Sequence, residues 1–79
     1  MELEIISPND VLFKGETEYV SFPGLEGAFD VLPHHAPMIA ALAAGSIKYR
    51  VEGQEGEQEI KIQSGFVEIK DDRLSVCIE

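Results

Sequence analysis

The sequence contains one cysteine and few basic residues, and each shortage excludes a class of structure or partner. The single cysteine, Cys77, excludes an internal disulfide and is compatible with a reducing cytosol. Six lysine and arginine residues against fifteen acidic residues give a net charge of -9. A chain with this balance cannot form the basic patch that binds phosphate backbones or anionic lipid. We therefore expect no nucleic-acid partner, and we expect a basic protein surface instead.

Long apolar runs are also missing. The first residues, Met-Glu-Leu-Glu, contain neither a basic region nor an apolar segment, so we expect no signal peptide and no insertion into the membrane. With 79 residues, 44% of them hydrophobic, the chain can form one small core. No repeat, linker or low-complexity segment divides it. We expect residues 1–79 to form a single acidic, cytosolic domain.

Apolar and polar residues alternate with the two-residue period of a β-strand over much of the chain. The alternation covers residues 2–7, 47–52, 59–63, 67–69 and 74–76. Turn-forming residues separate these stretches, and Gly15 is expected to mark a break or bulge in the run that leads to Phe22. Many short strands with frequent turns are typical of a β-sandwich or a β-barrel.

The glycine-containing turn at residues 53–56 predicts a hairpin between the second and third of these stretches. Its expected cross-strand pairs are Tyr49 with Ile60, Ile47 with Ile62, and Arg50 with Glu59. This register satisfies the apolar and the charge pattern together, and a slip by one residue would expose every isoleucine.

A second hairpin is expected across Asp71-Asp72. It pairs Val67 with Val76 and Ile69 with Leu74. In that register Phe66 and Cys77 lie side by side on the opposite, mostly polar face. They form either the core of a second sheet or a docking patch.

The stretch from Phe22 to Pro37 is rich in turn residues. Pro23-Gly24 suits the central positions of a type II turn, and a short strand is expected over residues 28–32. Pro33 and Pro37 then exclude a helix through the residues between them. Residues 38–45 remain ambiguous, because alanine, leucine and methionine favour a helix but two turns are too short to be stable alone.

His34 and His35 are the first candidates for metal binding. Neighbours on an extended chain point to opposite faces, so both cannot bind one ion without a special turn. A corner histidine that hydrogen-bonds the backbone or a partner is the alternative. No nucleophile motif or phosphate-binding loop is present, and we expect no catalytic, cofactor-binding or metal-binding residue. The acidic residues near the first hairpin are expected to form a solvated tip: Glu52, Glu55, Glu57 and Glu59.

Three segments resemble the epsilon subunit of the F-type ATP synthase, in its N-terminal β-sandwich domain. The main one runs Gly24-Leu25-Glu26-Gly27-Ala28-Phe29-Asp30-Val31-Leu32-Pro33-His34-His35-Ala36-Pro37. Phe13-Lys14-Gly15 and Ser64-Gly65-Phe66-Val67-Glu68-Ile69 also match the family. Asp30 and His34 replace glycines of the family pattern, and Ala44 replaces a proline. The resemblance implies a two-sheet, all-β sandwich of about eight to ten short, mostly antiparallel strands, with residues 38–42 on a strand.

The resemblance also implies a function. In the family this domain is a noncatalytic rotor subunit of the central stalk, which links the gamma subunit to the membrane c-ring and helps couple proton or sodium flow to ATP synthesis. It implies a peripheral location on the cytoplasmic face of the bacterial inner membrane. Most family members continue into a C-terminal helical hairpin that carries an inhibitory and, in some, a nucleotide-sensing role, and the resemblance of these residues assigns neither role to them.

Interface residues follow from the family motifs. The c-ring side is expected at Ser7, Glu26, Gly27 and Ala28, and the gamma side at His35, Ala36, Pro37 and Met38. We add the hypothesis that Phe66 and Cys77 extend the apolar contact with gamma. Two other functions remain open at this point: a small metal-dependent β-barrel enzyme that uses His34 or His35, and an unrelated β-sandwich adaptor.

Overall fold

The computed structural model of the protein describes all residues from 1 to 79 and contains eight strands and no helix. The strands are β1 (Glu2–Ser7), β2 (Asp10–Phe22), β3 (Phe29–Val31), β4 (Met38–Leu42), β5 (Gly45–Val51), β6 (Gln58–Ile62), β7 (Gly65–Lys70) and β8 (Arg73–Ile78). The expected all-β class is confirmed. The ambiguous segment at residues 38–42 is a strand, as the resemblance implied. The structure contains no helix that is long and apolar enough to cross a bilayer.

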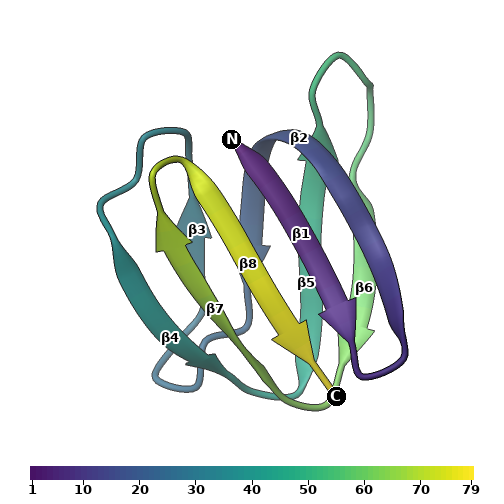
Figure 1. Ribbon diagram of the computed structural model, residues 1–79, viewed down its shortest axis with the longest axis vertical. Helices are drawn as coiled ribbons and strands as arrows, with labels where there is room; N and C mark the ends of the chain where they lie inside the picture. The colour runs from purple at the N-terminus through teal and green to yellow at the C-terminus, as the bar shows by residue number, and fades with distance from the viewer.

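The strands form one curled sheet whose two halves face each other. The pairing order is β4-β7-β8-β1-β2-β5-β6, and β3 pairs with β2 beside this path. In Figure 1, β4, β7, β8 and β1 make the front layer, and β3, β5 and β6 lie behind them. Every pair is antiparallel except β1 with β8. This arrangement confirms the expected sandwich of mostly antiparallel strands.

β2 belongs to both layers. Its first half pairs with β1, and its second half pairs with β5 and β3. The pairing register shifts twice along the strand, once at Leu12 and once at Glu18. Each shift is a β-bulge, which bends a strand and increases its twist. The break expected at Gly15 is therefore wrong, since Gly15 pairs with Leu3 inside an unbroken strand and the bulges lie on either side of it.

Fifteen buried hydrophobic residues fill the space between the layers. Alternate residues of each strand supply them, which explains the two-residue period of the sequence. The front layer contributes Leu3 and Ile5, both fully buried, and the back layer contributes Ile47. Phe13 packs against Tyr49 with ring centroids 4.5 Å apart and ring planes tilted by 45°, and burial raises the pKa of the Tyr49 phenol.

The β5–β6 hairpin has a register two residues away from the expected one. The observed pairs are Ile47 with Ile60, Tyr49 with Gln58, and Lys48 with Glu59. The connecting loop spans residues 52–57 and is longer than the glycine-containing turn suggested. A two-residue shift keeps every side chain on the same face and again opposes a cation to Glu59, so the sequence pattern cannot distinguish the two registers.

The β7–β8 hairpin has the expected register. Val67 pairs with Val76, and Phe66 pairs with Cys77. Asp71 and Asp72 have φ angles of 53° and 60°, as in the two-residue type I′ turn that suits a hairpin. The short turn leaves one possible register for the two strands.

Leu3→Ala tests the contribution of this core. Leu3 has no exposed surface, so the variant should lose about 2–5 kcal/mol of unfolding free energy through lost contacts and a residual cavity. Chemical denaturation measures this loss. Leu32→Ala is the control, because Leu32 is 60% exposed and its truncation should change stability by less than about 0.5 kcal/mol. Equal losses in the two variants would contradict the assigned core.

Candidate functional site

The turn in the central stretch lies later than the sequence suggested. Gly24 pairs with Leu42 of β4 in an isolated bridge, so it is held in extended pairing. The Gly27 N–H donates to the Gly24 carbonyl at 3.0 Å, which places residues 25–26 at the centre of the turn. The expected type II turn centred on Pro23-Gly24 is therefore wrong.

The two glycines of this turn are required for different reasons. A Cβ on Gly24 would collide with the Gly27 carbonyl and lie 2.9 Å from the Phe29 ring. Gly27 has open space around it but a φ of +132°, which side chains disfavour. This pairing and turn hold Glu26 and Ala28 at the surface.

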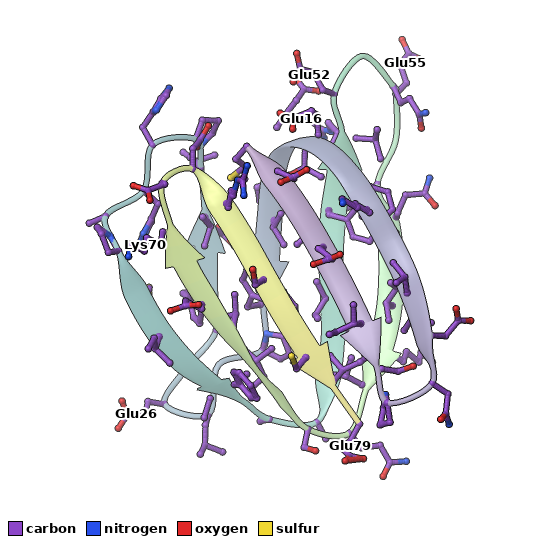
Figure 2. The ribbon with its side chains drawn as sticks, in the orientation of Figure 1. Glu16, Glu26, Glu52, Glu55, Lys70 and Glu79 are labelled. Atoms are coloured by element: carbon purple, nitrogen blue, oxygen red, sulfur yellow. The ribbon has the colours of Figure 1, made fainter.

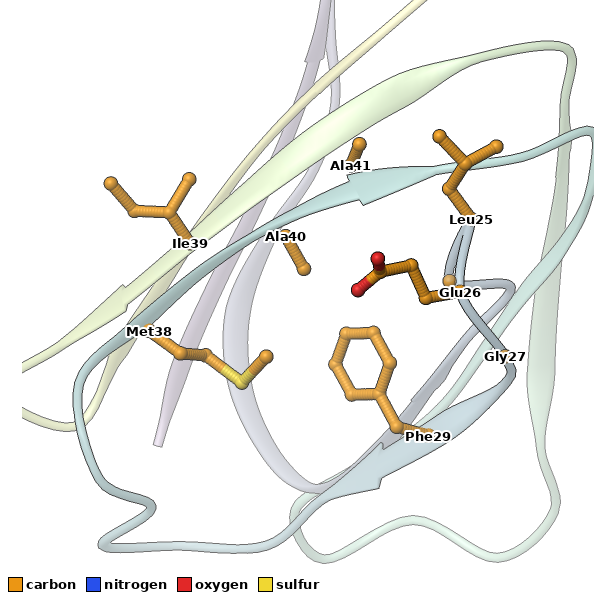
Figure 3. A pocket seen from close by; sticks show the side chains of 9 residues that line it. Leu25, Glu26, Gly27, Phe29, Met38, Ile39, Ala40 and Ala41 are labelled. Atoms are coloured by element: carbon orange, nitrogen blue, oxygen red, sulfur yellow. The ribbon is translucent and has the colours of Figure 1, made fainter.

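A hollow of about 360 Å³ lies between this turn and β4. It is lined by Gly24, Leu25, Glu26, Gly27, Phe29, Met38, Ile39, Ala40 and Ala41. Figure 3 shows the Phe29 ring and the Met38 side chain pointing into it, with the Glu26 carboxylate close to the ring. Glu26 is the only charged residue of the lining, so the hollow is apolar with one negative group at its rim.

The residues expected on the c-ring side lie at one end of the molecule. Ser7 ends β1, and its hydroxyl donates weakly to the Asp10 carbonyl at 3.4 Å. The turn after β1 and the turn that contains Glu26 are both at the lower end in Figure 1. In Figure 2, Glu52 and Glu55 lie at the opposite end. The acidic hairpin tip is therefore far from the expected c-ring side.

The residues expected on the gamma side separate into two places. His35, Ala36 and Pro37 form the link before β4, and Met38 begins that strand and lines the hollow. Phe66 and Cys77 instead lie on the outward face of the front layer. Phe66 is 51% exposed, so the alternative that it belongs to a core is wrong.

An apolar row crosses this outward face. Strand registers place Val11, Ile6, Cys77, Phe66 and Ala41 side by side over five strands. The next row is largely polar and contains Glu4, Ser75 and Glu68. Sequence reasoning found only two members of the row, because the others become neighbours through the parallel β1–β8 pair and the β4–β7 pair.

The histidine corner is tied to the β7–β8 turn. His34 has a φ of 66°, and its N–H donates to Oδ1 of Asp72 at 2.8 Å. The other carboxylate oxygen, Oδ2, lies 3.7 Å from the amino group of Met1. His35 lies with Nδ1 2.7 Å from the Ala36 carbonyl. Nowhere in residues 1–79 do three potential metal ligands meet, so the geometry favours the structural interpretation of this corner.

Comparison with known proteins identifies the family. The model of the ATP synthase delta/epsilon chain, β-sandwich domain, matches residues 1–79. The chain belongs to this family. The resemblance found in the sequence is thereby confirmed, and an unrelated β-sandwich adaptor is excluded.

Two bacterial relatives illustrate the similarity. The chain is 37% identical over 79 residues to the ATP synthase epsilon chain of Nitratidesulfovibrio vulgaris strain DP4. It is 40% identical over 81 residues to that of Leptospira interrogans serovar copenhageni. Both alignments cover all of this chain but only 58% and 61% of the relatives.

Solved structures show the same fold. A chain of the Euglena gracilis mitochondrial ATP synthase superposes with a TM-score of 0.87 at 22% identity, covering 96% of this chain and 48% of that one. A chain from the Tetrahymena thermophila central stalk and c-ring superposes with a TM-score of 0.79 at 17% identity, covering 99% and 62%.

The contact between Asp72 and His34 predicts a pH dependence of stability. The His34 N–H lowers the pKa of the Asp72 carboxyl in the folded state. A carboxyl whose pKa is lower in the folded than in the unfolded chain stabilises the fold above its ordinary pKa of about 4. That contribution disappears as the pH falls through the folded pKa. We expect Asp72→Ala to lower the melting temperature at pH 7. In acid, the difference in melting temperature between the variant and the wild type should be smaller.

Asp71→Ala is the matched control. Asp71 occupies the same turn with a similar positive φ, so alanine causes a similar backbone strain at either position. The Asp71 carboxylate, however, accepts no hydrogen bond within the protein. An Asp72→Ala deficit that equals the Asp71→Ala deficit at every pH would contradict this role.

Proposed function

We propose that residues 1–79 form the β-sandwich domain of a noncatalytic rotor subunit, which links the gamma subunit to the c-ring of an F-type ATP synthase. The family match over every residue of the chain carries this proposal. The superposed structures come from ATP synthase assemblies, one titled as central stalk and c-ring. In this role the domain helps couple proton or sodium flow to ATP synthesis without touching the phosphoryl or proton chemistry.

The architecture suits a mechanical role. Two layers packed on one core resist deformation, because protein interiors are as dense as organic crystals. A contact at one end of such a body is therefore transmitted to its other surfaces. The Ser7 and Glu26 turns would meet the c-ring, and the link before β4, together with Met38, would meet gamma.

The apolar row extends the proposed gamma surface. Phe66 and Cys77 lie near the centre of the row, with Ala41 beside Phe66 and Ile6 beside Cys77. Ile6 directly precedes Ser7, so the row reaches the end assigned to the c-ring. A partner that wraps from the outward face to this end would cover both surfaces.

The relatives that match this chain come from bacteria. In the proposed complex the domain is a peripheral component on the cytoplasmic face of the inner membrane. No group of three potential metal ligands includes His34 or His35, so the structure lends no support to the metal-dependent enzyme.

Co-purification tests the proposal. The tagged chain, expressed with the gamma subunit from the same organism, should retain gamma through affinity and size-exclusion steps. A gamma subunit that is well folded and does not associate with the chain would overturn the assignment.

Phe66→Asp tests the gamma surface. A carboxylate in the middle of the row should weaken association with gamma about tenfold or more, because a buried charge without a partner is costly. Gln54→Asp is the control, because it places the same carboxylate in the exposed hairpin tip, away from the proposed partner surfaces. Calorimetric titration of the gamma subunit into each variant measures both affinities. Unchanged binding by the folded Phe66→Asp chain would remove this surface from the gamma contact.

Salt dependence tests the c-ring contact. If Glu26 faces basic ring loops, higher ionic strength should weaken binding of the gamma complex to detergent-purified c-ring. Glu26→Gln should reduce both the affinity and its salt dependence. Glu55→Gln makes the same charge change at the opposite end of the molecule and should do neither. An affinity that does not respond to salt would contradict the electrostatic part of the proposal.

A further inference from the structure

β4 is the last strand of its layer, and half of its outer edge has no backbone partner. At one end of the strand the Ala41 carbonyl accepts the Leu25 N–H at 2.9 Å. Backbone groups of alternate residues in a strand point to the same side, so those of Ile39 point to the same outer edge as those of Ala41. No strand and no turn pairs with Ile39 on that side. The N–H donor and the carbonyl acceptor of Ile39 are therefore free.

The apolar hollow lies directly beside this free edge. Ile39 is 73% exposed, the most exposed of the large hydrophobic side chains of the protein. Met38 and Ala40 are its neighbours on the strand, and both line the hollow with Phe29 opposite. An extended segment on this edge would find hydrogen bonds for its backbone and an apolar recess for an alternate side chain.

The charge at this place restricts the occupant. Glu26 is at the rim, no lysine, arginine or histidine lines the hollow, and the whole chain has a net charge of -9. Phosphates and acidic peptides are disfavoured here. A basic residue next to an apolar one suits the site, since the cation can approach the Glu26 carboxylate while the apolar side chain enters the recess.

We propose that an extended segment of a partner protein adds to β4 at Ile39, places an apolar side chain in the hollow and directs a basic side chain to Glu26. For the identity of the partner the inference rests on the proposed function, which assigns the link before β4 and Met38 to the gamma side. The segment is therefore taken to come from the gamma subunit. In this inference Glu26 contacts both partners, because it lies at the rim of the hollow and also in the turn at the end assigned to the c-ring.

Ile39→Pro tests the backbone pairing. The Ile39 N–H points away from β7, so proline removes the free donor without removing a bond of the β4–β7 ladder, and edge strands tolerate such a proline. We expect a near-normal melting temperature and about a tenfold weaker affinity for purified gamma subunit. Ile39→Val is the control, because it keeps the donor and most of the side chain, and its affinity should remain within about threefold of the wild type.

The outcomes separate the two proposals. If the wild type binds gamma and Ile39→Pro binds equally well while folded, strand addition is wrong and the proposed function stands. If Ile39→Val loses as much affinity as Ile39→Pro, the contact is made by the side chain, and strand addition is again wrong. If the folded wild type does not bind gamma, the proposed function fails and the assigned partner fails with it.

A second measurement requires no variant. Amide hydrogen exchange of the wild-type chain should show strong protection of the Ile39 N–H on addition of gamma, because a new hydrogen bond shields it. The Glu55 amide in the hairpin tip is the internal reference and should not change. A gamma complex in which the Ile39 amide exchanges as fast as in the free chain would overturn the inference even if Ile39→Pro does not fold.

Discussion

The architecture depends on one strand that serves both layers. β2 pairs with β1 in the front layer and then with β5 and β3 in the back layer. Its bulges at Leu12 and Glu18 supply the bend that a straight strand lacks. Because the chain passes between layers in this way, Leu3 and Ile5 of β1 come to face Ile47 of β5 across a closed core.

On the opposite side of the sandwich, little backbone pairing joins the two layers. There β3 and β4 are the outer strands, and a single bridge between Gly24 and Leu42 joins the layers. A Cβ on Gly24 would collide with the Gly27 carbonyl, and the hollow lies next to this bridge, between the turn and β4. The surfaces proposed for the partners lie around this open side and the adjoining end, whereas the acidic hairpin tip lies away from them (Figure 2).

Much of this fold follows from the sequence because the two-residue period is strong. The β7–β8 hairpin was predictable to the residue, since a two-residue Asp-Asp turn permits one register. The β5–β6 register was not, because neither apolar alternation nor charge pairing changes when strands slip by two residues. The extended pairing of Gly24 was also missed, since its cause is the distant Leu42. The apolar row and the hollow arise from strands remote in sequence, so only Phe66, Cys77, Glu26, Gly27 and Met38 could be named in advance.

The central claim is that the open side of the sandwich and its adjoining end meet the other subunits while the hairpin tip remains in solvent. The most direct test is a cryo-EM map of the ATP synthase that contains this chain, at a resolution that shows side chains. The account predicts partner density against Ile39, Glu26 and Phe66, and none within contact of Glu52 or Glu55. Partner density on the hairpin tip, with the hollow and the apolar row facing water, would contradict it.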